Sequence, residues 1–348
     1  MSFKEAVSKD DADQETRVSS LVAVTGADGF IGSHLVEALV RRGHRVRAMA
    51  QYNSAGSWGW LDTVEPDVLA EVEVVLGDVR DFGSVSGLMA GASTVYHLAA
   101  LIAIPYSYVA PRSYLDTNAG GTLNVLEAAR ALDTQRIVHT STSEVYGTAR
   151  TVPISETHPL QAQSPYSASK VAADKLAESY HLSFNLPVVT LRPFNTYGPR
   201  QSARAVIPTI MSQIAAGSAS IELGDLRPTR DFNFVSDTVA AFMTVGEAPD
   251  DRVVGQVLNA GSGREISIGD LVTLIAEVMG SEVEVTQQSQ RLRPTGSEVM
   301  RLLCDNSRIG EATGWKPCVS LREGLTRTAA WFSEPTNLAR YKTGQYSI

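Results

Sequence analysis

The sequence predicts an α/β fold, with a doubly wound parallel sheet covered by helices and a smaller mixed α/β lobe beside it. Short β-branched runs alternate with longer amphipathic stretches, as in repeated strand-helix-strand units. A glycine-rich turn follows the first run, and hydroxyl residues with one glutamate follow a later run. Open α/β sheets bind ligands beyond the carboxyl ends of their strands, so both features are expected to face one crevice.

Composition limits the possible classes of protein. The chain has 348 residues, 43% hydrophobic and 20% charged, which is enough for one large or two modest globular domains. Its net charge of −8 argues against a general nucleic-acid surface, and no stretch is long and apolar enough to span a bilayer. Cys304 and Cys318 give neither a disulfide framework nor a metal-binding spacing. We therefore expect a cytoplasmic protein without a metal ion, a nucleic-acid partner or a membrane partner.

The first ordered elements are predicted to be a strand, a glycine loop and a helix. Residues 21–24 show a buried-strand pattern, and a helix pattern runs through Arg42. Between them, Gly26 and Gly29 lack side chains, so backbone N–H groups can approach a pyrophosphate at the helix N-terminus. Gly32 allows the helix to pack closely on the strand. Three glycines alone could mark only a tight turn, but in this context they favour a dinucleotide.

The next strands bear on the choice of dinucleotide. The second strand, 45–49, leads into Gln51, where an NAD enzyme commonly carries an Asp or Glu that binds ribose. That carboxylate is absent. No arginine immediately follows the strand to bind a 2′-phosphate either, so NAD and NADP both remain open. Asp78 follows the strand 72–76 and is expected near the adenine edge.

A later stretch carries groups suited to acid-base chemistry. An apolar run, 137–138, leads into hydroxyl residues and Glu144, while Tyr166 and Lys170 stand four apart on one face of a helix pattern. An ammonium near a phenol stabilises the phenolate and lowers the pKa of the tyrosine, and the Thr142 hydroxyl can bind the same substrate oxygen. These groups suit the oxidation of an alcohol. A lone Tyr-x-x-x-Lys would be weak evidence, so its weight comes from the neighbouring motifs.

The chain is expected to divide after a further strand, 188–192. Residues 20–192 would form the dinucleotide-binding domain with the catalytic groups, and 193–332 mainly a substrate-binding lobe that interleaves with the sheet. The polar residues 1–19 are expected to be a mobile tail, and 333–348 a C-terminal tail.

Two long helices are expected at about 112–132 and 166–184, each with an apolar face. Those faces could pack on the sheet, on a partner subunit or on both. Trp58 and Trp60 could belong to the core or to the wall of the crevice. His97 follows a strand and is expected to be a packed residue rather than a catalytic base.

Several motifs together resemble the extended short-chain dehydrogenase/reductase family over nearly the whole ordered chain. They are the three-glycine loop, Asp78-Val79, His97-Leu98-Ala99-Ala100, Asn118, Thr142 and the Tyr166/Lys170 pair. Within that family, residues 141–147 resemble the nucleotide-sugar 4,6-dehydratases and UDP-glucuronate decarboxylases, which keep a Glu in the site, unlike most simple epimerases. The segments 52–61, 102–108 and 341–346 resemble the configuration-retaining UDP-N-acetylglucosamine 4,6-dehydratases of the legionaminic-acid type.

The resemblance implies a Rossmann-type domain with a tightly bound NAD or NADP that is regenerated in each cycle, and a homodimer formed through a four-helix interface. The cofactor contacts that it implies are Gly26, Asp28, Gly29, Phe30, Ile31, Gly32, Gln51, Asp78, Val79, Leu98, Ala99, Ala100, Asn118, Thr140, Tyr166 and Lys170. It also implies a nucleotide-sugar site, in which guanidinium groups would bind phosphates. The residues of that site are Tyr106, Asn195, Arg230, Arg293 and Glu298.

The implied reaction is oxidation of UDP-N-acetylglucosamine at carbon 4, loss of water across carbons 5 and 6, and hydride return to carbon 6. The implied catalytic residues are Thr142, Ser143, Glu144, Tyr166 and Lys170. Glucose dehydratases of the family carry an Asp where Ser143 stands, so either Glu144 both takes and returns the proton or water assists. GDP-mannose dehydratases have a similar Ser-Glu pair. A UDP-glucuronate decarboxylase and a 4-epimerase are alternatives, as is a dinucleotide sensor, which would not need these groups together.

Overall fold

The computed structural model describes residues 20–342. The expected tail at 1–19 and the end of the closing motif, including Tyr346, lie outside the described residues. Within residues 20–342, no helix has both the length and the apolar character needed to cross a bilayer.

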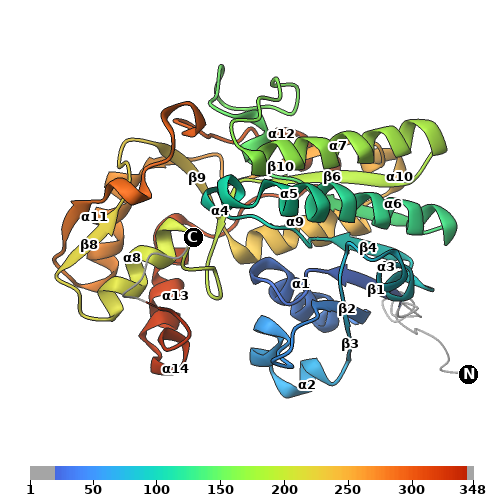
Figure 1. Ribbon diagram of the computed structural model, residues 1–348, viewed down its shortest axis with the longest axis horizontal. Helices are drawn as coiled ribbons and strands as arrows, with labels where there is room; N and C mark the ends of the chain where they lie inside the picture. Colours follow the sequence, from blue (N-terminus) through green and yellow to red (C-terminus); the bar gives the residue numbers. More distant parts are fainter. Residues whose placement is uncertain (1–19, 343–348) are drawn as a thin grey trace, which may run out of the picture.

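A seven-stranded parallel sheet forms the centre of the molecule (Figure 1). From one edge to the other, its strands are β10 (Val257–Ala260), β6 (Val188–Pro193), β5 (Arg136–Thr140), β4 (Thr94–His97), β1 (Leu21–Thr25), β2 (Arg45–Gln51) and β3 (Val72–Gly77). Every strand pairing in this sheet is parallel. The chain runs outward from β1 to β3 and then returns to β4 on the other side of β1. The predicted doubly wound sheet is confirmed, and ligands bind where the strand order reverses in this way.

Helices cover both faces of the sheet. The helices of one face are α1 (Phe30–Arg41) and α9 (Val235–Glu247), and those of the other are α3 (Phe82–Met89), α6 (Gly121–Ala131) and α7 (Pro165–Phe184). Each face has its own cluster of buried apolar side chains. The start of α7 is fixed locally, because the Ser164 side chain accepts a hydrogen bond from the Ser167 N–H and Pro165 follows as the first helical residue.

The helix predicted at about 112–132 is present but not regular. It consists of α5 (Pro111–Tyr114), a π-helical stretch η3 (Leu115–Gly120) and α6. Gly121, the first residue of α6, lies close to Val79: a Cβ added to Gly121 would be 2.8 Å from the Cγ2 atom of Val79. π-Helical turns often occur at functional sites, and this one carries the buried Asn118.

The smaller lobe interleaves with the main sheet. Its strands form a three-stranded sheet of β11 (Glu265–Ser267), β9 (Thr229–Phe234) and β7 (Asn195–Tyr197), and a two-stranded sheet of β12 (Glu284–Gln287) and β8 (Ser220–Leu223). Its main helices are α8 (Val206–Ala215), α11 (Ile268–Met279) and α13 (Leu321–Ser333). Between these elements, α9 and β10 return to the main sheet, so the lobe is not a separate stretch of chain.

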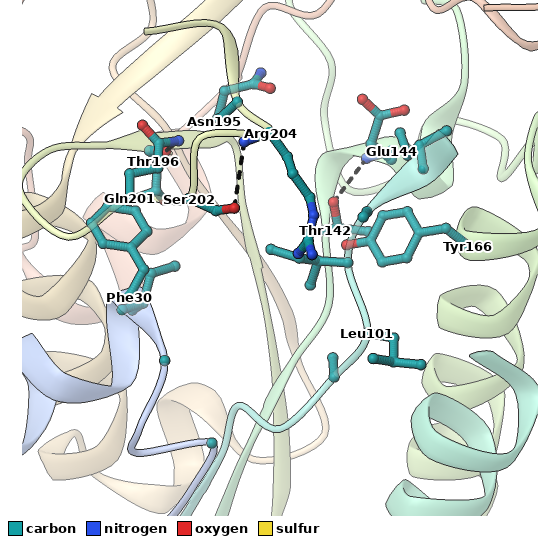
Figure 2. A pocket seen from close by; sticks show the side chains of 18 of the residues that line it. Phe30, Leu101, Thr142, Glu144, Tyr166, Asn195, Thr196, Gln201, Ser202 and Arg204 are labelled. Carbon is teal, nitrogen blue, oxygen red and sulfur yellow. Dashed lines mark hydrogen bonds between the residues drawn. The ribbon is translucent and has the colours of Figure 1, made fainter. Parts of the chain in front are cut away.

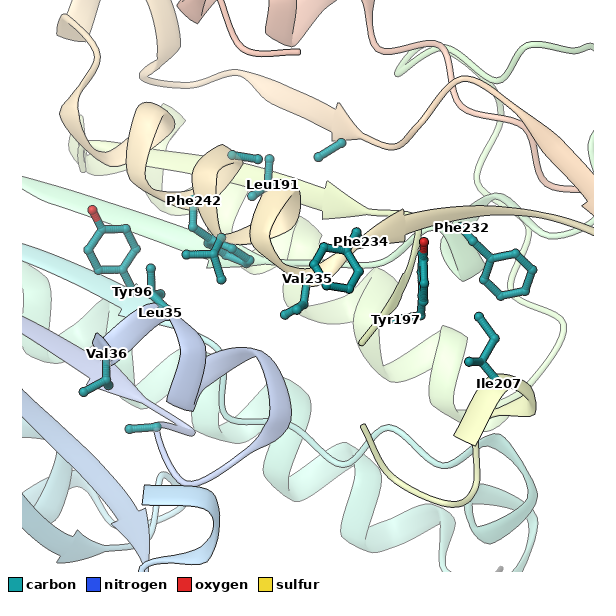
Figure 3. Close-up of a cluster of buried hydrophobic side chains, with 14 of the residues drawn as sticks. Leu35, Val36, Tyr96, Leu191, Tyr197, Ile207, Phe232, Phe234, Val235 and Phe242 are labelled. Atoms are coloured by element: carbon teal, nitrogen blue, oxygen red, sulfur yellow. The ribbon is translucent and has the colours of Figure 1, made fainter. Parts of the chain in front are cut away.

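One apolar cluster runs beneath the junction of sheet and lobe (Figure 3). At one end, Leu35 of α1 and Phe242 of α9 pack near Tyr96 of β4; at the other, Tyr197 and Phe234 of the lobe continue the row. These side chains are almost completely buried. Because the packing is continuous, the lobe and the sheet hold the walls of the crevice between them in a fixed relation.

Shorter helical elements complete the connections. They are η2 (Gly59–Thr63), α2 (Pro66–Leu69), α4 (Ile104–Val109), η4 (Ser143–Tyr146), α10 (Asp250–Val253), η5 (Ser289–Arg291), η6 (Thr295–Ser297), α12 (Ser307–Thr313) and α14 (Pro335–Leu338). The segment after Phe332 differs from the expected tail as far as Lys342, because α14 is helical and Tyr341 packs on its neighbours. The Tyr341 ring centroid lies 4.9 Å from that of Phe332, and its hydroxyl donates a hydrogen bond to the Gln201 carbonyl at 2.7 Å.

Candidate active site

A cavity of about 1130 Å³ lies beyond the carboxyl ends of the central strands, between the sheet and the lobe. Figure 2 shows Thr142, Glu144 and Tyr166 on one side of it, and Phe30 and Gln201 on the other. Every residue that the sequence predicts for the site lines this cavity, with the exception of Asn118. A large cavity at the reversal of the strand order is the expected place for a ligand.

The glycine loop forms one wall of the cavity at the N-terminus of α1. Gly26 has a φ of +68°, and a Cβ there would lie 2.7 Å from the Ala99 N atom. A Cβ on Gly32 would lie 2.1 Å from the Gly26 carbonyl oxygen. The loop therefore needs glycine at both positions, and its backbone forms a cradle for a pyrophosphate at a helix N-terminus.

Polar groups from three other strand ends complete this wall. The Asp28 carboxylate accepts a hydrogen bond from the Gln51 N–H at 3.1 Å. Asp78 pairs with Arg80, which the sequence analysis did not single out and which also lines the cavity. The Thr140 Oγ1 atom is buried without a hydrogen-bond partner within residues 20–342. A glycine cradle and an unpaired hydroxyl in one cavity fit a nicotinamide dinucleotide laid across the strand ends.

Tyr166, Lys170 and Thr142 all line the cavity. Figure 2 shows the hydroxyl ends of Thr142 and Tyr166 side by side. Lys170, one helical turn after Tyr166 on α7, is 3% exposed, and its Nζ donates a hydrogen bond to the Thr140 carbonyl oxygen at 2.5 Å. The Ser167 hydroxyl donates to the Glu144 carbonyl oxygen at 2.7 Å, which ties the start of α7 to the turn η4.

The predicted lowering of the Tyr166 pKa is wrong in direction. Burial raises the pKa of this phenol above its ordinary value, and a hydrogen bond with Thr142 offsets only part of that effect. The ring lies against that of Tyr114, at 6.2 Å between centroids. Burial also lowers the pKa of Lys170 to about 8. Both side chains are thus held in a largely water-free environment, which disfavours the phenolate form of Tyr166 and the ammonium form of Lys170.

A buried ionic network that the sequence analysis missed lies behind Lys170. Asp174, a further turn along α7, accepts hydrogen bonds from Ser141 at 2.8 Å and from Arg192 at 2.8 Å, and its other oxygen lies 3.2 Å from His139. Burial alone would raise the pKa of Asp174, but the hydrogen bond with His139 and the charge of Arg192 lower it to about 2. Its place four residues after Lys170 was the only signal in the sequence.

Glu144 and Ser143 reach the cavity from the short turn η4, which begins just after β5. Thr142 caps this turn, because its Oγ1 accepts a hydrogen bond from the Glu144 N–H at 3.2 Å (Figure 2). The Glu144 side chain is half-buried, whereas Ser143 is 2% exposed. The turn therefore places one carboxylate in the same wall as the Thr142 and Tyr166 hydroxyls.

The lobe contributes cationic groups to the opposite wall. Arg230 donates a hydrogen bond to Glu298 at 3.1 Å, and Arg293 lies 3.7 Å from the same carboxylate oxygen. The Nη1 atom of Arg293 is buried without a hydrogen-bond partner among residues 20–342. Burial lowers the pKa of Arg230, and the nearby Glu144 charge counteracts this. A guanidinium with an unused buried donor is suited to bind an anionic ligand.

The other two predicted substrate contacts, Tyr106 and Asn195, also line the cavity. Tyr106 on α4 is 41% exposed at the edge of the cavity. Asn195 lines it at the start of β7 and makes a long hydrogen bond, 3.4 Å, to the Asp231 carbonyl oxygen. Arg200 and Arg204, which were not predicted, also line the cavity. Arg200 is held by Glu37 at 2.6 Å, so this arginine belongs to the scaffold of the loop that follows β7.

Asn118 has a different role from the predicted cofactor contact. It is 1% exposed, and its side chain binds both the N–H and the carbonyl oxygen of Leu101, at 2.8 and 2.9 Å. It also donates to the Ser169 hydroxyl at 2.9 Å. Asn118 therefore fixes the backbone of Leu101, which lines the cavity, and does not itself line it.

The structure places the two tryptophans that the sequence left open, and His97, which was expected to be a packed residue. Trp60 lines the cavity, and its ring centroid lies 5.8 Å from that of Trp331 and 6.4 Å from that of Tyr341. Trp58 packs against the main apolar cluster. His97 is buried between the hydroxyls of Thr25 and Thr122, at 2.8 and 3.0 Å, as a packed residue.

Comparison with known proteins agrees with this geometry. A family model described as GDP-mannose 4,6 dehydratase matches residues 23–328. The chain is 35% identical to a UDP-glucose 4-epimerase from Mycolicibacterium smegmatis, over 89% of this chain and 97% of the relative. It is 33% identical to a dTDP-glucose 4,6-dehydratase from Actinoplanes sp., again over 89% of this chain and 97% of the relative.

The same similarity extends to a solved structure. A dTDP-glucose 4,6-dehydratase from Streptomyces venezuelae, solved with NAD bound, superposes with a TM-score of 0.83 at 28% identity and covers 92% of this chain and 99% of its own. The family match spans both the sheet and the lobe, and therefore both walls of the cavity. The chain belongs to the GDP-mannose 4,6-dehydratase family of extended short-chain dehydrogenase/reductases, which contains nucleotide-sugar dehydratases and epimerases.

Proposed function

We propose that this protein is a nucleotide-sugar 4,6-dehydratase that converts UDP-N-acetylglucosamine to the UDP-4-keto-6-deoxy sugar. The observation that carries the proposal is the Glu144 carboxylate in the same cavity wall as the Thr142 and Tyr166 hydroxyls. Oxidation and reduction at carbon 4 need only a hydroxyl acid-base pair. A carboxylate beside that pair gives the site a second base, which elimination of water requires.

The first step assigns a proton to Tyr166. The phenolate form of Tyr166 would take the proton of the carbon 4 hydroxyl as hydride leaves, and Thr142 would bind the same substrate oxygen and hold it in place. Burial opposes the phenolate in the free protein, so the Lys170 ammonium and the positive charge of a bound oxidised nicotinamide would have to stabilise it. Lys170 lies one turn away with its ammonium fixed on the Thr140 carbonyl oxygen, close to where negative charge forms. A bound dinucleotide would accept hydride from carbon 4 and return it to carbon 6, so the overall reaction has no net redox change.

The second step belongs to Glu144. A ketone at carbon 4 acidifies the carbon 5 proton, which the Glu144 carboxylate would remove. The carbon 6 hydroxyl then leaves as water with a proton that Glu144 returns, because Ser143 is a weak acid at its position. Carbon 6 would later receive hydride and carbon 5 would take a proton from solvent, while Tyr166 releases to solvent the proton of the carbon 4 hydroxyl. The products are the 4-keto-6-deoxy sugar and one water.

The lobe wall would bind the nucleotide part of the substrate. We assign the diphosphate to Arg230 and Arg293, since both are cationic and one has an unused buried donor. Glu298 would hold both arginines in place and accept a ribose hydroxyl. Asn195 and Tyr106 complete this surface.

Two features support the choice of sugar and cofactor. The segments 52–61 and 341–346 both carry the resemblance to UDP-N-acetylglucosamine dehydratases, and Trp60, which lines the cavity, packs against Tyr341. For the cofactor we propose NAD, held by the glycine cradle throughout the cycle; the structural neighbour from Streptomyces venezuelae was solved with NAD bound.

The second candidate is a 4-epimerase, because a relative with that name is 35% identical. An epimerase would use Thr142, Tyr166 and Lys170 in the same way, but its reaction would not need Glu144 as a second base. A UDP-glucuronate decarboxylase is a further alternative and would release carbon dioxide. These outcomes differ in product mass, so one assay separates them.

The test is a panel of UDP-, dTDP- and GDP-sugars incubated with purified protein without added cofactor, followed by mass spectrometry. We expect UDP-N-acetylglucosamine to lose one water. An unchanged mass with inversion at carbon 4 would identify an epimerase. Water loss only from GDP- or dTDP-sugars would refute the substrate and leave the reaction class standing.

We also propose a homodimer through α6 and α7, as the resemblance implies. Leu123 on α6 and Leu182 on α7 are exposed apolar residues on these helices, and an isologous interface needs only one self-complementary patch. A cytoplasmic location is part of the proposal, since Cys304 and Cys318 are both free and a reducing compartment keeps thiols in that state.

A further inference from the structure

The end of β2 has no acidic side chain, yet a carboxylate lies there. Asp28, from the glycine loop, accepts the N–H of Gln51, the last residue of β2, at 3.1 Å. In dinucleotide-binding sheets, an acid at this strand end commonly binds the 2′-hydroxyl of the adenosine ribose. The Asp28 side chain therefore reaches that place from a different element.

Asp28 is held in position by the loop between β2 and η2. The Trp60 N–H donates to the Asp28 carbonyl oxygen at 3.0 Å, and a Cβ on Gly59 would lie 2.6 Å from that oxygen. Asn53 orders this loop, because its Oδ1 accepts the Ser57 N–H at 3.2 Å. The loop thus closes over the glycine turn and leaves the Asp28 carboxylate facing the cavity.

The carboxylate has no cation to neutralise it. Asp28 is half-buried and makes no ion pair within residues 20–342; its hydrogen bonds are with the backbone N–H groups of Gln51 and of Asp28 itself. Burial raises the pKa of Asp28 above its ordinary value, and those two backbone bonds counteract the shift. A desolvated carboxylate of this kind is stabilised by hydroxyl donors and opposes a nearby dianion.

We propose that Asp28, in place of the missing acid at the end of β2, accepts the 2′-hydroxyl of the adenosine ribose and makes the site selective for NAD over NADP. This inference rests on the dinucleotide site of the proposed function and adds the residue that selects the dinucleotide. A ribose hydroxyl would donate to the carboxylate. A 2′-phosphate at the same position would bring two or nearly two negative charges against it.

Cations that line the same cavity could act in the opposite direction. Arg80, just beyond the end of the neighbouring strand β3, is already paired with Asp78. Arg340 lines the same cavity and lies over the Trp60 ring, with its Cζ 5.7 Å from the ring centroid. If it bound a 2′-phosphate, the site would accept NADP. The Arg340 side chain is exposed, whereas the Asp28 carboxylate accepts a hydrogen bond from the backbone at the end of β2. The charge that is fixed at the strand end is the one expected to decide selectivity.

The experiment compares the parent protein with Asp28→Asn, Arg340→Ala and a control, Asp225→Asn, which changes a carboxylate of the same cavity that is paired with Arg227. Asparagine can still accept the Gln51 N–H, so the loop should remain folded. Bound dinucleotide is released by acid and identified by mass spectrometry. Affinities for NAD, NADP and nicotinamide 2′-deoxyadenosine dinucleotide are then measured on protein freed of cofactor, from quenching of tryptophan fluorescence.

We expect the parent protein to carry NAD. Loss of one charge-assisted hydrogen bond should weaken NAD binding to Asp28→Asn by roughly 10- to 100-fold. The ratio of NADP to NAD affinity should rise in that variant by roughly 100-fold or more, and should not change in Asp225→Asn. The 2′-deoxy analogue should bind the parent as weakly as NAD binds Asp28→Asn, with no further loss when both changes are combined.

Three results would overturn the inference: equal NAD and NADP affinity in the parent, an unchanged ratio in Asp28→Asn, or full-strength binding of the 2′-deoxy analogue to the parent. The measurement with the 2′-deoxy analogue uses only the parent protein, so it tests the inference even if Asp28→Asn does not fold. Loss of NADP binding only in Arg340→Ala would assign the selection to Arg340 instead. Dehydratase activity is assayed separately, since its absence would refute the proposed function without altering these affinities.

Discussion

Glu144→Gln should separate oxidation from elimination, because it changes a charge without changing the local structure. The two hydrogen bonds that fix the turn η4 involve the backbone of Glu144: its N–H donates to Thr142 Oγ1, and its carbonyl oxygen accepts from Ser167. Glutamine keeps both. Arg230 keeps its carboxylate partner Glu298 at 3.1 Å, so the free energy of unfolding should change by less than about 1 kcal/mol.

The catalytic effect should be much larger than the effect on stability. Loss of a positioned general base commonly costs about 100- to 10,000-fold, or about 3 to 5 kcal/mol in the barrier to elimination. Thr142, Tyr166 and Lys170 are untouched, so oxidation at carbon 4 should proceed at close to the parent rate. Reduced cofactor and a 4-keto sugar should therefore accumulate as far as their equilibrium allows.

The assay is a single turnover in deuterium oxide, followed by near-ultraviolet absorbance of the reduced cofactor and by mass spectrometry of the sugar. Parent protein should place solvent deuterium on carbon 5, and Glu144→Gln should not. Tyr166→Phe is the matched control, since it should block reduced cofactor as well. Ser143→Ala should slow elimination by less than about 10-fold if Glu144 also returns the proton. Water loss by Glu144→Gln at the parent rate would refute the role of Glu144 as the base.

Three further predictions concern the scaffold. Asp174→Asn should leave Arg192 buried without its carboxylate partner and lower the free energy of unfolding by about 3 to 5 kcal/mol. In the parent, the pKa of Asp174 is about 2, below its ordinary value. The stabilisation by this carboxylate is therefore present above about pH 4 and is lost as pH falls through about 2. An acid titration that is identical in both proteins would contradict this. Leu123→Glu should shift the proposed dimer toward monomer in light scattering, and an unchanged dimer would exclude α6 from the interface. Tyr341→Phe should lower the free energy of unfolding by about 1 kcal/mol, because the hydrogen bond to Gln201 is lost. Tyr341→Ala should lower it several times more, as measured by thermal unfolding. Equal effects of the two variants would show that the packing of the ring contributes nothing.

The sheet and the placement of the acid-base groups could be predicted from sequence because their signals are local. A β-branched run followed by glycines at Gly26, Gly29 and Gly32 specifies a strand, a turn and a helix within a dozen positions. Tyr166 and Lys170 share a face because four residues span about one helical turn. Such features depend on neighbours in the chain, and the structure has all of these residues lining one cavity.

The parts that sequence reasoning missed depend on contacts between distant segments. The tertiary fold buries Tyr166 beside Tyr114, and this burial raises the pKa of its phenol. The sequence shows only the spacing to Lys170, from which a lower pKa was expected. Asn118 lies on a π-helical stretch that no sequence motif predicts, and its side chain binds the backbone of Leu101. Trp60 and Tyr341 come from opposite ends of the chain, so only the packed lobe brings their rings together.

The most direct test of the account follows a deuterium atom placed on carbon 4 of UDP-N-acetylglucosamine through the reaction of the parent protein. If one bound cofactor removes hydride from carbon 4 and returns it after Glu144 has eliminated water, the deuterium should appear on carbon 6 of the same molecule, in a product lighter by one water. Nuclear magnetic resonance and mass spectrometry of the product would show both. Deuterium that stays on carbon 4 or is lost to solvent would contradict the proposed dehydratase.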